Sequence, residues 1–197
     1  PRVLKPLAFV AALGPACWLV LAALGRFDIG ADPIKTIQVV TGLATLILLL
    51  VTLAVTPLRK YAHWSELFRL RRMLGLYAFF YVLLHALTYF VFDQSLDPGL
   101  IWADTVKHPR IAVGFVSFLM LIPLAVTSTD RWQRRLRRNW KRLHTLGIHW
   151  LWFVFTFSYL GRVIQGREMP FAVLALAVSL GALGLRIAVW VRGRKGA

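Results

Sequence analysis

Three of the five histidines lie in apolar segments, and they are the residues of this sequence best suited to do chemistry. His85 stands in YVLLHALTYF (81–90), a run without a charged residue. His144 and His149 lie five residues apart in RLHTLGIHW, directly after a strongly basic segment. A polar group among apolar side chains needs a partner, and neutral imidazole is a common ligand of transition metals and haem iron. We therefore predict that these histidines bind metal or haem, the alternative for each being a hydrogen bond to a neighbouring carbonyl.

Other chemistries have less support in the sequence. The remaining histidines, His63 and His108, lie in polar segments and are expected to be solvated. We find no Walker loop, no GxGxxG, no CxxC pair and no HExxH motif. A zinc site needs four closely placed ligands, and a proton relay usually needs an acid within the membrane, whereas every acid here falls in a loop or at a helix end. Haem ligation needs only imidazoles from facing helices, and it is the chemistry we favour.

The composition is that of a membrane protein, because 58% of the 197 residues are hydrophobic and only 16% are charged. A helix needs about 20 apolar residues to cross ~30 Å of hydrocarbon at roughly 1.5 Å per residue. Six windows have this length: 7–25, 36–56, 73–92, 111–128, 143–161 and 170–191. We predict an all-α integral membrane protein in which residues 1–197 form a single six-helix transmembrane bundle, with ordinary turns between the helices.

The basic residues indicate how this bundle is oriented. If the N-terminus is cytoplasmic, the segments on that side hold 17 Lys and Arg against Glu66 and Asp130, while the opposite connections hold six basic residues against six acids. This asymmetry fits the positive-inside rule and predicts that both termini are cytoplasmic. The formal charge of +16 is then explained by orientation and by contact with anionic membrane lipid, so we expect no nucleic-acid partner.

Helix geometry separates the three candidate histidines by depth. His85 lies about 20 Å along the helix from the basic end of its window, nearer the outer face. Measured from the cytoplasmic charges, His149 lies about 10 Å and His144 about 17 Å below His85. Five residues turn a helix by about 140°, so His144 and His149 should not both face one iron. Depth favours His149 as the partner of His85, and this choice stays open.

Several segments resemble a known family, among them GADPIKTIQVVTG, RRMLGLYAFFYVLLHALTYF, HPRIAVGFVSFLMLIPLAVTST and RRNWKRLHTLGIH. The combination of LGLxxFxxxxLH with WxxLH is similar to the haem-binding membrane subunits of bacterial methionine sulfoxide reductase systems, which belong with the ferric reductase-like transmembrane proteins. The resemblance implies a multi-pass bundle in the bacterial inner membrane that carries b-type haem, one or two, and it also implies FMN. It further implies electrons from the quinone pool or a cytosolic flavin reductase and, as partner, a periplasmic molybdopterin methionine sulfoxide reductase.

The resemblance also assigns haem-iron ligands. By the motif, His85 corresponds to the haem-ligand histidine of the third helix and His144 to the first histidine of the fifth. Where the family has another histidine about 13 residues further on, this sequence has Phe157 and Ser158. His149 is the other intramembrane imidazole of that helix. The family motif therefore favours His144, whereas depth favours His149.

The sequence ends six residues after the last window, which leads us to expect no flavin or nicotinamide domain and an electron-transfer subunit that depends on a separate donor. Two alternatives stay open. One is another ferric reductase or a cytochrome b-type quinol or metal reductase subunit. The other is a colourless membrane carrier or anchor, which would explain six helices but not intramembrane histidines.

Overall fold

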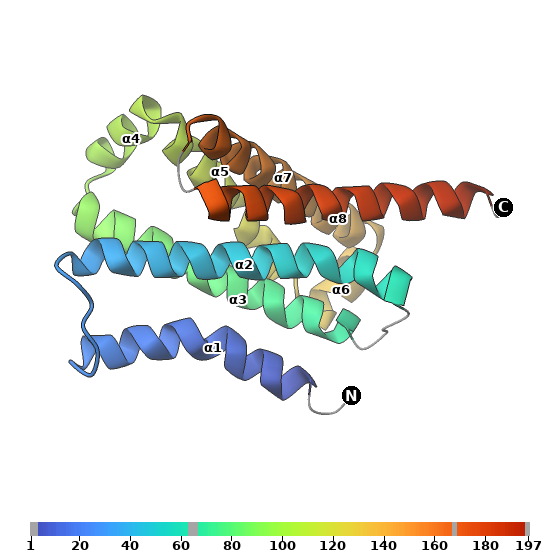
Figure 1. Cartoon of the computed structure of the whole chain (residues 1–197), viewed down its shortest axis with the longest axis horizontal. Coiled ribbons are helices and arrows are strands. Elements are labelled where there is room, and N and C mark those ends of the chain that lie inside the picture. Colours follow the sequence, from blue (N-terminus) through green and yellow to red (C-terminus); the bar gives the residue numbers. More distant parts are fainter. Residues whose placement is uncertain (1–3, 63–66, 167–168, 196–197) are drawn as a thin grey trace.

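The computed structural model describes residues 4–62, 67–166 and 169–195, and every regular element in these ranges is helical. The elements are α1 (Leu4–Ala23), α2 (Pro33–Ala62), α3 (Leu67–Thr88), the π-helical turn η1 (Tyr89–Asp93), α4 (Pro98–Lys107), α5 (Pro109–Val126), α6 (Asp130–Leu136), α7 (Arg138–Ile164) and α8 (Met169–Lys195). Figure 1 shows the long helices side by side, with both termini at one end of the bundle and α4 at the other. The all-α prediction is confirmed.

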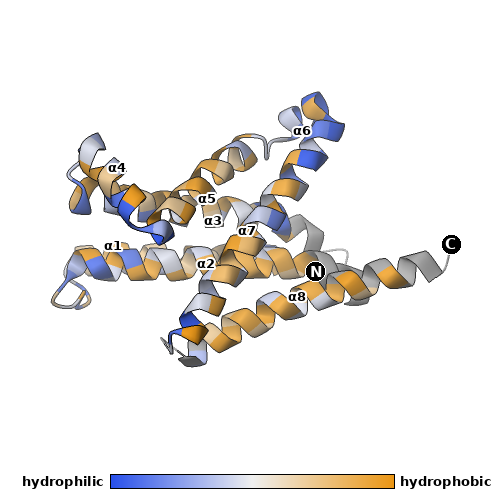
Figure 2. Ribbon diagram, turned by 90° about the horizontal axis from the view of Figure 1, so that it is seen from above, coloured by the Kyte–Doolittle hydropathy of each residue, from blue (hydrophilic) through white to orange (hydrophobic). Residues whose placement is uncertain are grey.

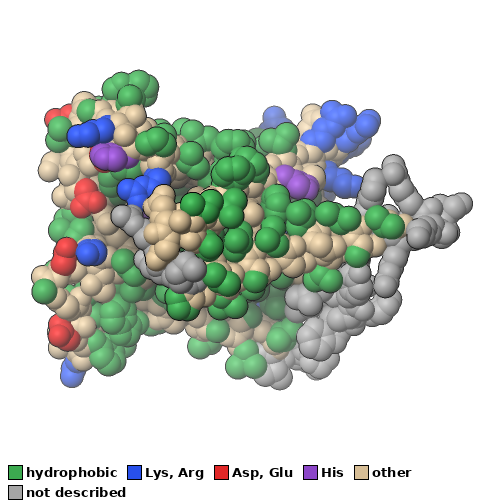
Figure 3. Space-filling model, turned by 45° about the horizontal axis from the view of Figure 1, so that its top comes forward, with side chains coloured by type: hydrophobic (Ala, Val, Ile, Leu, Met, Phe, Trp, Pro, Cys, Tyr) green, Lys and Arg blue, Asp and Glu red, His purple; other side chains and the backbone are tan. Residues whose placement is uncertain are grey.

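Four stretches within these helices are long and apolar enough to cross a membrane: Leu4–Ala23, Pro33–Val55, Leu70–Asp93 and Pro109–Val126. They correspond to the first four predicted windows. The last two windows lie on α7 and α8, where the apolar stretch Ala172–Leu185 is shorter, and their crossing stays a prediction. Figures 2 and 3 show apolar residues along the helices and charged side chains gathered at the two ends. We call the end with the termini the inner end and the opposite one the outer end.

Helix α2 is the centre of the bundle, because it contributes to all three hydrophobic clusters of the described residues. The first cluster joins α1, α2 and α3 around Leu48, Leu74 and Tyr81. The second joins α2 to α7 and α8 through small residues of α8. The third consists of Leu121, Leu124 and Leu151, and side chains of α2 and α3 pack against it. We call this third set the leucine cluster.

Tyr81 holds α1 against the rest of the bundle. Its side chain is fully buried, and its hydroxyl donates to the Ala12 carbonyl oxygen at 2.7 Å and accepts from the Ala16 amide at 3.1 Å. Pro15, which has no amide hydrogen to donate to the helix, stands in the same turn of α1. The hydroxyl therefore satisfies both groups in a region without water, as neighbouring side chains commonly do at a proline in a transmembrane helix.

The prediction of ordinary turns between the helices is wrong at two places, where short helices form. The Asp97 carboxylate accepts from the amides of Gly99 and Leu100, and Pro98 occupies the first turn, so α4 begins with a strong cap. The Thr129 hydroxyl caps α6 in the same way. Helix α7 begins at Arg138, before the predicted window, because charged residues can continue a helix beyond its apolar part.

Candidate functional site

His85 is half-buried on α3 and turned toward α2. Its Nδ1 lies 3.0 Å from the carbonyl oxygen of Gln38 and 3.4 Å from the Thr41 hydroxyl oxygen. A carbonyl oxygen can only accept, so Nδ1 carries the proton of the neutral ring. The tautomer that this bond selects leaves Nε2 with its lone pair, which is the form in which imidazole binds a metal.

A glycine of α2, Gly42, leaves room for the His85 ring. At Gly42 a Cβ atom would lie 3.4 Å from His85 Cε1 and 3.5 Å from its Nδ1, so the imidazole already occupies the space over the glycine. The Gln38 side chain in turn donates to the Asp93 carboxylate at the end of η1. Gln38 therefore joins α2 to the outer end of α3 and η1 twice, through its carbonyl and through its amide. These contacts fix the orientation of His85.

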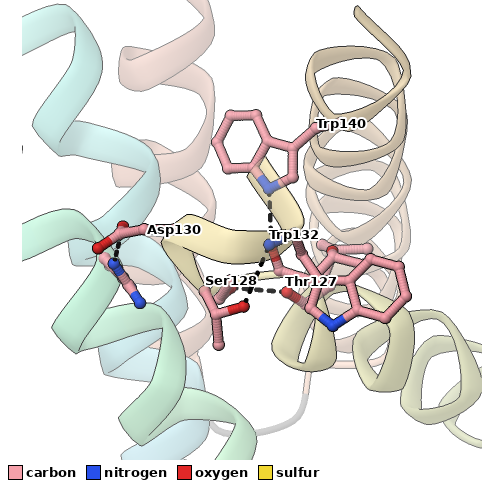
Figure 4. A network of polar contacts seen from close by, with 8 residues as sticks. Thr127, Ser128, Asp130, Trp132 and Trp140 are labelled. Atoms are coloured by element: carbon pink, nitrogen blue, oxygen red, sulfur yellow. Dashed lines mark hydrogen bonds and ion pairs between the residues drawn. The ribbon is translucent and has the colours of Figure 1, made fainter. Parts of the chain in front are cut away.

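His144 lies on α7 near the inner end of the bundle and is fixed by Trp140. The two rings stack with centroids 4.1 Å apart, and His144 Nδ1 lies 3.2 Å from the Trp140 carbonyl oxygen. The Trp140 indole nitrogen donates to the Thr127 carbonyl oxygen at 2.8 Å, at the end of α5. Figure 4 shows Trp140 directed toward this α5–α6 connection. The WxxLH pattern thus places the imidazole on a tryptophan that is itself held by the facing helix.

The second ring nitrogen of His144, Nε2, is available to bind a metal. Nε2 is buried and makes no hydrogen bond within the described residues. The Leu124 carbonyl also lies near the ring and accepts from the Ser128 hydroxyl; as an acceptor it cannot bond to a ring nitrogen that carries no proton. With Nδ1 as donor to Trp140, Nε2 is a buried lone pair without a proton to satisfy it. Buried polar atoms of this kind need an explanation, and a bound ion or cofactor is one.

His149 is placed differently. Its side chain is exposed, and its Nδ1 lies 2.6 Å from the carbonyl oxygen of Thr145 in the same helix. Gly147 packs against α5, and His149 lies two residues later, about 200° around the helix. It therefore shares the α8 side of α7 with Trp152, whose indole donates to a carbonyl of α8. His144 is directed to the α5 side and His149 is not.

The structure places the candidate ligands at separate sites along the bundle. His85 lies one turn beyond Val82, toward the outer end of α3, and His144 lies about two turns before Leu151, toward the inner end of α7. No hydrogen bond or ring contact within the described residues joins His85 to His144 or His149. No group of three or more His, Cys, Asp and Glu in the described ranges is suited to hold a metal ion. The arrangement offers single imidazoles at two depths, not one protein-built metal cluster.

Comparison with known families identifies the family to which this bundle belongs. Residues 41–157 match the family described as "Ferric reductase like transmembrane component". The chain belongs to this family of ferric reductase-like transmembrane proteins. Among its relatives in the comparison is a protein of Xanthomonas euvesicatoria pv. vesicatoria, named "Protein-methionine-sulfoxide reductase heme-binding subunit MsrQ", which is 49% identical over 140 residues. A protein of Herminiimonas arsenicoxydans with the same name is 48% identical over 145 residues.

These matches cover most of the present chain but less of the relatives. The aligned region spans 71% of this chain and 64% of the Xanthomonas protein, and 73% of this chain and 66% of the Herminiimonas protein. No solved structure matches the chain. Membership of the ferric reductase-like family and the four apolar spans together identify the chain as an integral membrane protein.

Sequence analysis missed the residues that orient the imidazoles in this ferric reductase-like bundle. Gln38 and Thr41 are ordinary polar residues in an apolar window, and their spacing of three on one helix face was the available signal. Trp140 was visible as the first residue of WxxLH, but its stacking on His144 was not. Trp150, also on α7, has a buried indole nitrogen that makes no hydrogen bond within the described residues.

Proposed function

We propose that this chain is a haem-binding, electron-transfer subunit of a methionine sulfoxide reductase system. The observation that carries the proposal is the orientation of two imidazoles. His85 and His144 each direct Nδ1 to a backbone carbonyl, and the buried Nε2 of His144 makes no hydrogen bond within the described residues. Relatives at 48% and 49% identity are named as heme-binding subunits of such a reductase. An electron carrier within the bundle agrees with imidazoles placed at two depths.

His85 and His144 are the residues that we propose to hold haem iron, at an outer and an inner site. Haem b supplies a one-electron carrier when bound, since its iron alternates between the ferric and ferrous states. The chain has no CxxCH attachment motif, which favours noncovalent binding. Two depths favour two haem sites over one shared site. His149, exposed on the α8 side, is the weaker candidate ligand, although its Nε2 is also left unprotonated by the bond to Thr145.

The inner end of the bundle is where we propose that electrons enter. The connection between α5 and α7 carries basic side chains at Arg131, Arg134, Arg135 and Arg137, Arg138 begins α7, and all of them lie at the same end as both termini. Positive charge attracts anionic partners, so this end suits a flavin phosphate such as FMN or an acidic flavin reductase. The positive-inside rule makes it the cytoplasmic face of the bacterial inner membrane. The quinone pool is the alternative donor.

The outer end is where we propose that electrons leave, toward a periplasmic molybdopterin methionine sulfoxide reductase. At the outer end the described acids Asp28, Asp32, Asp93, Asp97 and Asp104 are matched by a similar number of bases, whereas the inner end is strongly basic, so the two ends differ in charge (Figure 3). The chain itself then acts as one subunit of an oxidoreductase system. Its residues orient the iron ligands and hold the carriers apart along the bundle.

Spectroscopy of single-histidine variants tests the proposal. The detergent-purified protein should give a b-type pyridine haemochrome, and His85→Ala and His144→Ala should each remove a distinct part of the haem absorbance or change its spin state. His149→Ala should change the spectrum little. His108→Ala, which removes an imidazole outside the spans, is the matched control. A colourless protein from haem-sufficient cells, or unchanged haem content in both the His85 and His144 variants, would refute the proposal.

A further inference from the structure

Helix α4 has its polar side turned inward and its apolar side turned outward. Ile101, Asp104 and Thr105 face the protein, and His108 follows at the same side. The opposite stripe is exposed and consists of Gly99, Trp102, Ala103 and Val106, with Leu100 and the exposed Lys107 along one edge. Trp102 is 72% exposed and Val106 is 65% exposed. A helix surrounded by water has the reverse arrangement, so the exposed apolar side of α4 needs an apolar surface to cover it.

The inward side is held by one carboxylate. Asp104 accepts a hydrogen bond from the Tyr89 hydroxyl at 2.6 Å and from the Gln94 amide at 3.0 Å, and its second oxygen lies 2.8 Å from His108 Nδ1. The hydrogen bond from Tyr89 lowers the pKa of the Asp104 carboxyl most; partial burial opposes this, and the hydrogen bond from His108 adds to it, so the carboxyl stays ionised at neutral pH. The Asp104 carboxylate is therefore satisfied within the protein.

The connection before α4 also fixes its position. Ser95 and Leu96 both adopt the left-handed conformation, with φ of 50° and 57°, which costs energy in residues other than glycine. The Leu96 amide nevertheless bonds to the Phe90 carbonyl oxygen at 2.8 Å, and Asp97 then caps α4. These two strained residues form the turn that reverses the chain direction after η1. The outward direction of Trp102 and Val106 is consequently set by the fold.

We propose that α4 is an interfacial helix whose Trp102, Ala103 and Val106 stripe lies in the lipid of the outer leaflet. At ten residues α4 is about 15 Å long, too short to cross a bilayer. Figure 1 shows it at the outer end and at the periphery of the bundle. Exposed apolar side chains also occur on the adjoining elements, at Phe92 of η1 and at Val113 and Val116 of α5, and α5 is one of the candidate membrane spans.

The residue types at the two edges of the stripe fit a lipid interface better than a protein partner. Tryptophan is enriched at the level of the lipid headgroups, where its ring is apolar and its N–H stays wet. Lys107 and Arg110, both exposed, follow the stripe at the junction with α5, within reach of phosphate groups. A stripe that docked a soluble partner would be exposed to water whenever the partner left, and an apolar surface of this kind is costly in water.

Nitroxide labels on α4 test the proposal in the full chain. The lone cysteine, Cys17, is replaced by serine, and labels are attached singly at Ala103→Cys and Val106→Cys. A label at Val116→Cys on α5 is the lipid reference, and one at Ala31→Cys in the α1–α2 connection is the water reference. The protein is placed in nanodiscs of phosphatidylethanolamine and phosphatidylglycerol. Collision rates with oxygen, which dissolves in lipid, and with a charged nickel chelate, which stays in water, are then measured.

We expect both α4 labels to resemble the Val116 reference, with frequent oxygen and rare nickel collisions. Labels that resemble the Ala31 reference would overturn the proposal, as would labels that are wet in the isolated chain and become protected only when the reductase partner is added. Strong spin–spin broadening that disappears on dilution with unlabelled protein would assign the stripe to a second copy instead. Two label positions guard against a single variant that fails to fold. The measurement does not depend on haem, so it is independent of the proposed function.

Discussion

The substitution Gly147→Ala tests the close approach of α5 and α7 on which the position of His144 depends. A Cβ atom at Gly147 would lie 2.7 Å from both Cδ atoms of Leu124 and 3.2 Å from its Cγ. Carbon atoms in favourable contact are about 3.5–4.0 Å apart, so the added methyl group overlaps the leucine by roughly 1 Å. Leu124 is only 7% exposed and belongs to the leucine cluster, which leaves its side chain little room to move.

The expected magnitude follows from two opposing terms. An extra methyl group in a packed core costs about 1–3 kcal/mol, because side chains leave their rotamers or the helices separate. Replacing glycine by alanine inside a helix returns up to about 1 kcal/mol. Gly75→Ala in α3 is the matched control, since nothing lies within 4 Å of its added Cβ atom and only the second term applies. We therefore expect Gly147→Ala to be less stable than Gly75→Ala by about 1–3 kcal/mol.

The two variants are compared by unfolding in mixed detergent micelles, followed by circular dichroism. The absorption spectrum is recorded in parallel, because separation of α5 and α7 should also disturb the His144-dependent haem signal and spare that of His85. Leu124→Ala combined with Gly147→Ala should recover part of the steric loss as a favourable coupling energy. Equal stabilities of Gly147→Ala and Gly75→Ala would refute the described contact between the two helices.

Two further outcomes are expected. Tyr81→Phe removes the hydroxyl that satisfies two buried backbone groups of α1, and it should lower the free energy of unfolding by about 1–3 kcal/mol in the same detergent assay; a loss below the measurement error would contradict the bridge. Because the pKa of Asp104 is lowered on folding, its carboxylate stabilises α4 above the unfolded pKa of about 3.9, and this contribution is lost as the pH falls through the lowered value. A nitroxide at Val106→Cys should therefore keep the same mobility from pH 8 to about 5 and become more mobile only in stronger acid. Asp104→Asn should abolish this pH dependence of the mobility. An unaltered acid transition in that variant would assign the transition to another group.

Several features followed from the sequence without knowledge of the fold. Apolar windows of membrane length can be recognised locally, because a span must satisfy its own backbone in lipid and must therefore be both long and apolar. Four of the six windows coincide with helices that meet this condition. The histidines could be selected for a related reason, since an imidazole is conspicuous among Leu, Val and Phe. The family motif around His85 and His144 agreed with the match over residues 41–157.

The short helices α4 and α6 were not predicted, although their caps were present in the sequence. The Asp-Pro pair at 97–98 and Thr129 are helix-start signals, but they also begin turns, and the segments that follow have too few residues to show a helical period. What distinguishes the two outcomes at α4 is a long-range contact. Asp104 satisfies partners on η1, and the residues of that contact are brought together only by the turn at Ser95 and Leu96.

Only the tertiary structure decided which side of α7 faces the interior. The sequence gives the angle between His144 and His149, about 140°, but not the direction of either, because a helix can be rotated about its axis without changing any local interaction. The rotation is fixed by Gly147, where α5 approaches most closely, and by Trp152 and its bond to α8. His144 is thereby directed toward α5 with Nε2 buried, and His149 is left exposed. In the same way, the contact of His85 with Gln38 exists only because α2 and α3 pack at this register, since partners 47 positions apart leave no pattern in the chain between them.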